Sequence, residues 1–245
     1  CDNNNIRTIA RIVVAKDPVL ANYQNNKFAI FDKATNTSSQ WVDLFSFEVQ
    51  DYNIDIAEEL VEKGFDEVNF DYIRFPDNKE VKKPVYSFRN KFSNGNHTKL
   101  YQAIELFLKK ANAVVDADIS VDVYAYTLWG SKERHLNENF NNIGQVIEYM
   151  VDHVDYIYPM VYPSHFSKSD RRKIDERYIG TEEHDVVYEA CKNGLRRVKD
   201  SDTQLIPWIQ GFWGDEEYIL NELKAVKDSG IDGFLIWNPK NKYEK

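Results

Sequence analysis

Residues 64–76, GFDEVNFDYIRFP, place acidic and amide side chains in a segment that otherwise has the composition of a buried strand. Asn69 and Asp71 alternate with the apolar Val68 and Phe70 at the period of two that a strand imposes on its side chains. One face of the predicted strand is therefore polar. Parallel strands in α/β proteins are usually covered on both sides and read as nearly continuous apolar runs, so a carboxylate near the end of one indicates a chemical function.

Around this segment, strand-like and helix-like patterns alternate along the chain. Six strands are predicted, at residues 6–14, 65–73, 119–127, 154–162, 204–212 and 230–238. Apolar stripes at helical spacing predict helices around residues 54–61, 100–115, 143–150, 187–198 and 219–226. Helices are expected to end at Gly64, Gly194 and Gly230. This repetition predicts an α/β fold with a parallel sheet, either open and doubly wound or closed as an eight-stranded barrel.

Polar and aromatic residues at several strand ends favour a TIM (β/α)8-type barrel, because the active site of a barrel is assembled from many strand ends. These residues are Lys16, Asp17, Asp71, Arg74, Asp122, Tyr126, Tyr162, His165, Gln210, Trp237 and Asn238. Six strands are two short of eight, so we expect the first two βα units to be missing from this chain, which we interpret as one barrel domain over residues 1–245. An open six-stranded sheet is the alternative. Within segment 22–47, strand-like runs at 27–31 and 40–44 predict a hairpin inserted after the first strand.

The composition argues against several classes of function. A formal net charge of -9, from 31 Lys and Arg against 40 Asp and Glu, opposes binding to nucleic acid and to anionic membrane surfaces. No apolar run approaches the roughly 20 residues that a membrane-spanning helix requires. The two cysteines support neither a disulfide framework nor a thiolate metal site. No metalloprotease, catalytic-triad or phosphate-loop motif occurs, so no metal and no cofactor is predicted.

Two long segments, 77–97 and 163–184, are locally basic in this acidic chain. Their cations are Lys79, Lys82, Lys83, Arg89 and Lys91 in the first segment and Lys168, Arg171, Arg172, Lys173 and Arg177 in the second. If both segments lie at the substrate entrance of a barrel, they favour an anionic carbohydrate. Ordinary solvated surface is the alternative interpretation.

Asp71 and Asp122 are the predicted catalytic residues. They lie in neighbouring predicted strands, where both could point into the mouth of a barrel. Paired carboxylates indicate glycoside hydrolysis, in which one protonates the leaving oxygen and the other attacks the anomeric carbon or activates water. We expect Asp71 to be the nucleophile or electrostatic stabiliser and Asp122 the general acid/base, although the roles could be exchanged. The structural alternative is that Asp71 pairs with Arg74 and Asp122 caps a loop.

Further residues at strand ends are predicted to bind a carbohydrate substrate: Asp17, Asn69, Arg74, Tyr126, Tyr162, His165, Gln210, Trp237 and Asn238. Sugar rings have C–H faces that stack on flat side chains, and Trp129, Trp208 and Trp213 also lie at or just beyond strand ends. Individually, each aromatic residue is more often part of a barrel core. A barrel with this aromatic cleft but without a working acid would be a non-catalytic carbohydrate-binding protein, which is the competing function.

Six motifs are spread over most of the chain: ARIVVAKDP (10–18), GFDEVNFDYIRFP (64–76), VDVYAY (121–126), YPMVYPSHF (158–166), PWIQGF (207–212) and GFLIWNPKNKY (233–243). Together they resemble the bacterial putative glycoside hydrolase domain family of the TIM-barrel glycosidase superfamily. This resemblance implies a TIM barrel that begins two βα units earlier, action on polysaccharide, and an extracellular or cell-envelope location. Ala15 departs from the family pattern, in which an aromatic residue is common.

The chain also resembles the chitinase-type family 18 glycosidases more distantly. On their Asp-x-x-Asp-x-Asp-x-Glu pattern, Asp66, Asn69 and Asp71 fall at the acidic positions. Ile73 replaces the catalytic Glu of that pattern. The replacement argues against substrate-assisted catalysis of the chitinase type.

Overall fold

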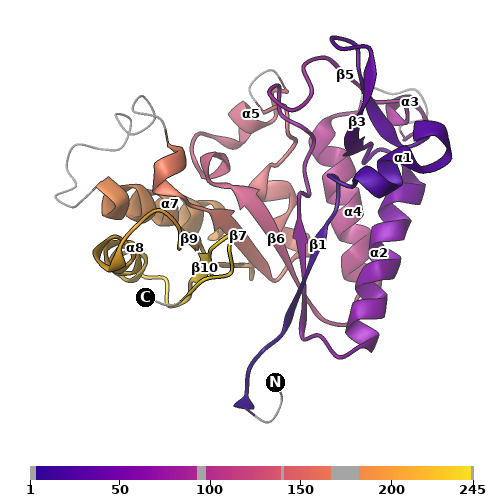
Figure 1. Cartoon of the computed structure of the whole chain (residues 1–245). Helices are drawn as coiled ribbons and strands as arrows, with labels where there is room; N and C mark the ends of the chain where they lie inside the picture. The colour runs from indigo at the N-terminus through magenta and orange to yellow at the C-terminus, as the bar shows by residue number, and fades with distance from the viewer. Residues whose placement is uncertain (1–3, 93–97, 139–140, 167–181, 244–245) are drawn as a thin grey trace. The chain divides into compact units, whose positions relative to one another are not determined.

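The computed structural model describes residues 4–92, 98–138, 141–166 and 182–243 (Figure 1). The chain forms two compact units: unit 1 consists of Cys1–Asp122 and Gly130–Asp155, and unit 2 of Val123–Trp129 and Tyr156–Lys245. The interpretation of the whole chain as one domain stays a prediction. Among the described helices, none combines the length and apolar character needed to cross a membrane.

Unit 1 contains most of the regular structure. Its elements are β1 (Ile9–Val13), α1 (Pro18–Asn26), β2 (Ala29–Asp32), β3 (Thr37–Val42), α2 (Phe47–Glu62), β4 (Glu67–Asp71), β5 (Pro84–Val85), α3 (Arg89–Phe92), α4 (Leu100–Val114), β6 (Asp118–Tyr124) as far as Asp122, α5 (Lys132–His135), and the 3-10 turns η3 (Ile147–Tyr149) and η4 (Val151–His153). Unit 2 holds the end of β6, η2 (Ala125–Leu128), β7 (Tyr156–Met160), η5 (Pro163–His165), α7 (Glu182–Val198), β8 (Gln204–Leu205), β9 (Trp208–Gln210), α8 (Glu216–Ser229) and β10 (Leu235–Trp237).

Each of the six predicted strands is confirmed, and these strands pair in parallel within each unit. In unit 1, β4 lies between β1 and β6, so that Arg11, Asn69 and Ser120 occupy one rung of the sheet. In unit 2, β9 lies between β7 and β10, and β8 pairs with β7. The strand predicted at residues 204–212 is divided into β8 and β9 at Pro207, which has no N–H to donate to a sheet. The upstream βα units of a closed barrel stay a prediction.

The sheet of unit 1 has one apolar and one polar face. Because side chains alternate along a strand, Val68 and Phe70 of β4 share the apolar face, which α2 and α4 cover (Figure 1). Phe70 meets Phe107 of α4 edge to face, with ring centroids 4.9 Å apart. The remaining face carries Asn69 and Asp71, as the alternation in the sequence predicts.

Local sequence explains where α2 begins and ends. The Ser46 hydroxyl accepts a hydrogen bond from Val49 N at 3.4 Å, which caps the first turn. Gly64 follows the last turn with φ of +89°, a conformation that glycine adopts without steric cost. This helix end and the corresponding one at Gly230, with φ of +90°, are therefore confirmed.

The segment predicted to form a hairpin contains β2 and β3, which pair antiparallel. A third strand, β5, joins them from the loop that follows β4, and the sequence pattern did not predict it. The buried Asp32 carboxylate of β2 holds the chain that leads into β5, because it accepts hydrogen bonds from Lys82 N at 3.1 Å and Lys83 N at 3.0 Å. The insertion thereby becomes a three-stranded sheet beside the end of β4.

Two of the helix predictions are wrong. Residues 143–150 form no α-helix, because Gly144 has φ of +77° and only the short turn η3 follows it. A Cβ at Gly144 would also approach the Leu100 side chain to 2.9 Å. Gly194 does not end a helix but lies inside α7, where the missing Cβ makes room for Leu205 of β8.

Candidate active site

Asp71 and Asp122 lie side by side on the polar face of the unit 1 sheet. Asp71 is the last residue of β4, and Asp122 is one residue beyond Val121, the register partner of Phe70. Both residues are buried, with exposed fractions of 6% and 3%. Since neighbouring strands are about 5 Å apart, the two carboxylates project from adjacent backbone positions.

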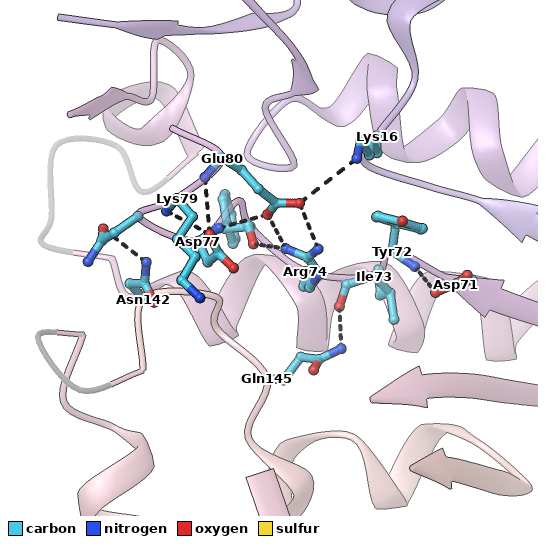
Figure 2. Close-up of polar contacts among 12 residues, drawn as sticks. Lys16, Asp71, Tyr72, Ile73, Arg74, Asp77, Lys79, Glu80, Asn142 and Gln145 are labelled. Carbon is cyan, nitrogen blue, oxygen red and sulfur yellow. Dashed lines mark hydrogen bonds and ion pairs between the residues drawn. The ribbon is translucent and has the colours of Figure 1, made fainter. Parts of the chain in front are cut away.

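Both oxygens of the Asp71 carboxylate are held. Oδ2 accepts from Arg11 Nε at 3.0 Å. Oδ1 accepts from the backbone N–H of Tyr72 at 2.6 Å, as Figure 2 shows. Arg11 also donates through Nη2 to the same Oδ2. Asp71 therefore pairs with Arg11 of β1. Sequence analysis did not select Arg11, although a cation in the middle of the apolar run IARIVV is the signal that could have identified it.

Asn69 connects Asp122 to the strand that carries Asp71. Its Nδ2 donates to Asp122 Oδ1 at 3.2 Å and to Ser120 Oγ at 3.0 Å. The amide oxygen of Asn69 is buried and has no hydrogen-bond partner within the described residues. An unpaired buried acceptor is costly, so this oxygen is suited to receive a hydroxyl or a water molecule.

The loop after β4 contains a residue with positive φ, Tyr72, and an ion pair between Arg74 and Glu80, which we call the latch. Tyr72 is in the left-handed region with φ of +52°, which is rare for a bulky residue. Arg74 donates to both oxygens of Glu80, at 2.7 and 3.1 Å, and to Phe75 O at 3.1 Å (Figure 2). Its guanidinium also lies 4.5 Å from the ring centre of Trp41.

Arg74 and Asp17 therefore have structural contacts in this fold. Arg74 is 3% exposed, and its latch fixes the loop that begins directly after Asp71. Asp17 caps α1, because its Oδ1 accepts from Val19 N at 2.8 Å and Leu20 N at 2.9 Å. Lys16 extends toward this region, with its Nζ 3.9 Å from Glu80 Oε1 (Figure 2).

The structure describes only the first of the two predicted groups of cations. In that group, the Arg89 guanidinium binds Glu138 at 2.8 Å and also donates a hydrogen bond to the carbonyl of Thr98. The cations predicted in the second segment, Lys168, Arg171, Arg172, Lys173 and Arg177, lie outside the described residues.

A shallow pocket lined by Asn5, Ile6, Arg7 and Asp66 is at the amino-terminal ends of β1 and β4, away from both catalytic candidates.

In unit 2, Gln210 and Asn238 connect the loops that follow the strands. The Oε1 atom of Gln210 accepts from Ser164 N at 3.2 Å and Ser164 Oγ at 2.7 Å, while its Nε2 donates to Phe212 O at 2.9 Å. Asn238 Nδ2 donates to Gly211 O at 2.6 Å and to Lys242 O at 2.8 Å. These two side-chain amides link the loops that follow β7, β9 and β10 to one another.

A buried carboxyl group, which sequence analysis did not select, lies beneath Gln210. Glu222 of α8 accepts from Gln210 N at 3.1 Å, and its side chain is fully buried. Burial raises the pKa of Glu222 to about 8, because the charged form loses its hydration; the Gln210 N–H lowers this pKa and the charge of Glu183 raises it further. Glu222 therefore holds its proton at neutral pH.

The braced loops of unit 2 carry a group of aromatic rings. Tyr162 is 5.4 Å from both His165 and Phe212, and Phe212 is 5.1 Å from Trp213. Partial burial lowers the pKa of His165, so the imidazole is neutral at neutral pH.

The other two aromatic candidates of unit 2 have different neighbours. Trp237 packs against Trp208 with ring centroids 6.0 Å apart. Tyr126 is 36% exposed and meets Tyr124 at 5.7 Å.

Comparison with known proteins identifies the family of this chain. Residues 1–243 match the family described as putative glycosyl hydrolase domain. The chain belongs to this family. The resemblance seen in the sequence motifs is thereby confirmed for almost the whole chain. No protein with a curated description matches it.

Solved structures show the same fold in glycoside hydrolase domains. The glycoside hydrolase domain of PgaB (BpsB) from Bordetella bronchiseptica has a TM-score of 0.59 at 14% identity, over 95% of this chain and 70% of that one. The glycoside hydrolase domain of PelA from Pseudomonas aeruginosa has a TM-score of 0.54 at 11% identity, over 99% and 82% of the two chains.

A hypothetical protein from Ruminiclostridium thermocellum is 33% identical over 50% of this chain, with a TM-score of 0.39. The chain spans 61% of the length of that protein. The α/β fold is thus shared with glycoside hydrolase domains, while the identities of the PgaB and PelA matches are too low to carry an activity.

Proposed function

We propose that this protein hydrolyses glycosidic bonds in a polysaccharide with Asp71 and Asp122 as its two catalytic carboxylates. The observation that carries this proposal is their placement on adjacent positions of β4 and β6, on the polar face and at the carboxyl end of β4. The partly exposed Arg11 and the buried Asn69 donate hydrogen bonds to the pair and orient its carboxylates, which is how a catalytic pair is held in a productive geometry. Membership of the glycosyl hydrolase domain family supports the same reaction class.

In the proposed mechanism, Asp122 protonates the oxygen of the glycosidic bond as that bond breaks. Asp71 attacks the anomeric carbon and forms a covalent glycosyl ester. Asp122, now a carboxylate, then takes a proton from water, whose oxygen attacks the anomeric carbon and releases Asp71. The two steps consume one water molecule and restore both side chains.

The neighbours of the pair have matching roles in this proposal. Arg11 compensates the negative charge that Asp71 carries as a nucleophile and aims its Oδ2. Asn69 fixes Asp122 through Nδ2, and its buried Oδ1 is available to accept a hydrogen bond from a substrate hydroxyl. The proposed location outside the cell or in its envelope rests on the resemblance to the bacterial putative glycoside hydrolase domain family.

A reducing-end release assay tests the proposal on a panel of neutral and acidic polysaccharides. Asp122→Asn should lower turnover by at least about 10²-fold, because general acid–base catalysis contributes about 10²- to 10⁴-fold. Asp71→Asn should lower turnover at least as much, because it removes the nucleophile. Asp116→Asn, which changes an exposed carboxylate just before β6, is the matched control and should leave turnover unchanged. Full turnover in either active-site variant would overturn the assignment. Binding without turnover in the parent protein would favour the non-catalytic carbohydrate-binding alternative.

A further inference from the structure

Trp213 stands out in unit 2, because it combines high exposure with a disfavoured backbone conformation. Its exposed fraction is 83%, the largest among the exposed large hydrophobic residues of the described chain. Its φ is +59°, in the left-handed region that bulky residues rarely occupy. Neither feature stabilises the isolated protein, so together they point to a role in which the indole contacts something else.

The surrounding loop holds the indole in place. Phe212 and His165 contact it with steeply inclined rings, at centroid distances of 5.1 and 6.3 Å and interplanar angles of 83° and 66°. Gln210 ties Phe212 O to Ser164, so both loops that contribute these rings are cross-linked. At Gly214 a Cβ would come within 2.7 Å of the Tyr218 ring, which shows how tightly the turn after Trp213 is packed.

The side chains of Trp213 and His165 indicate which class of ligand this surface can bind. The indole has an exposed flat apolar ring, and the exposed His165 beside it provides hydrogen-bonding nitrogens without a fixed charge. A pyranose ring has the complementary pattern, since its C–H groups form an apolar face and its hydroxyls project from the edge. Two side chains of this kind fit one sugar ring better than an extended protein surface, which needs a larger contact area.

We propose that Trp213 is the platform of a sugar-binding subsite, on which one ring of the polysaccharide stacks while His165 hydrogen-bonds to its hydroxyl groups. This inference rests on the proposed function, because it assigns to unit 2 a part in binding the same class of substrate. It adds a residue and a role that the two catalytic carboxylates do not require.

The test uses Trp213→Gly, because glycine removes the indole and also relieves the backbone strain. Asn241→Gly is the matched control, since Asn241 also has a positive φ, of +52°, in unit 2 and carries no ring. Trp213→Phe is the second variant and keeps a smaller flat ring. Binding is measured by calorimetry to cellohexaose, chitohexaose and hexagalacturonate, with every variant in the Asp71→Asn background to prevent turnover.

The expected result separates binding from stability. Trp213→Gly should weaken the affinity for the bound hexasaccharide tenfold or more, while its melting temperature stays equal or rises. Trp213→Phe should lose less affinity, and Asn241→Gly should bind as the parent does. A fall in melting temperature with unchanged affinity would show that the indole is structural and would overturn the inference.

The failure of this inference can be distinguished from a failure of the proposed function. Equal affinity in Trp213→Gly, or no binding of any hexasaccharide by the Asp71→Asn parent, would overturn the platform. The reducing-end assay with Asp71→Asn and Asp122→Asn decides the hydrolase separately, since it depends on turnover and not on Trp213.

Discussion

Arg11 and Asp71 lie on neighbouring parallel strands, and the guanidinium Nε of Arg11 donates to Asp71 Oδ2 at 3.0 Å. The Arg11 side chain is 38% exposed and that of Asp71 is 8% exposed, so the pair bridges the surface and the buried polar face. In the proposed mechanism, Asp71 must approach an anomeric carbon from a fixed direction. Arg11 is the side chain that sets this direction.

Arg11→Met should therefore lower kcat by about 10- to 100-fold with a smaller change in KM, because a displaced catalytic group loses orientation. Arg11→Lys should recover part of kcat, since it restores the charge without the planar fork. Arg7→Met is the control, because Arg7 pairs with Glu67 at 2.9 Å near the opposite end of the same sheet. If steady-state kinetics show equal losses of kcat in the Arg7 and Arg11 variants, Arg11 has no special relation to Asp71.

The adjacency of Asp71 and Asp122 also predicts the stereochemistry of the reaction. Neighbouring strands lie about 5 Å apart, and retaining enzymes hold their carboxyl groups about 5–5.5 Å apart. Inverting enzymes need about 6.5–9.5 Å to admit a water molecule between the carboxyls and the sugar. Proton NMR of the first product should show retention of the anomeric configuration, and an inverted product would reject Asp71 as the nucleophile.

The latch between Arg74 and Glu80 should contribute measurably to stability. Glu80→Gln weakens two hydrogen bonds to a guanidinium that is 3% exposed, and we expect the free energy of unfolding to fall by about 1–2 kcal/mol. The value is at the low end for charged hydrogen bonds, because the Glu80 side chain is 23% exposed and partly screened. Urea unfolding measures the change, with Glu58→Gln on the exposed face of α2 as the control. Equal stability of the two variants would show that the latch is energetically neutral.

Glu222 predicts a dependence of stability on pH. Its pKa is raised from an ordinary 4.5 to about 8 in the folded protein, chiefly by burial. The folded state therefore binds this proton more tightly than the unfolded state, and the resulting stability is full below about pH 4.5 and lost as the pH rises toward 8.

Glu222→Gln has no proton to lose and keeps an oxygen for Gln210 N. Its free energy of unfolding should thus fall less steeply between pH 5 and 8 than that of the parent, by up to about 1.4 kcal/mol per pH unit. Glu217→Gln, on the exposed side of the same helix, should follow the parent curve. Parallel curves for the parent and Glu222→Gln would show that Glu222 is ionised when buried.

Gly194→Ala should destabilise the protein although alanine favours helices. A Cβ at this position would lie 2.4 Å from Leu205 Cδ2, and overpacking of this kind costs about 1–3 kcal/mol against a gain of about 1 kcal/mol in helix propensity. Leu205→Ala should cost about 2–5 kcal/mol by leaving a cavity. The double variant should lose less stability than the sum of the two in thermal unfolding, because the added methyl group enters that cavity. Additive losses would mean that the two side chains do not share space.

Local patterns in the sequence determined the six strands, the polar face of β4 and the hairpin. A strand imposes its period of two on Asn69 and Asp71 wherever it lies in the fold, so these features could be read from neighbouring residues alone. The same reasoning identified Asp71 and Asp122 as a candidate pair, since parallel strands align their carboxyl ends.

Tertiary structure decided which side chains meet. Arg11 binds Asp71 across 60 positions of sequence, and Gln210 binds Ser164 across 46, distances at which no periodicity operates. Arg74 was predicted to bind substrate from its place at a strand end, and the fold adds contacts with Glu80, Phe75 and Trp41 that its sequence position did not indicate. Local sequence thus set which residues place polar groups on each strand, whereas long-range packing set which of these groups bind one another.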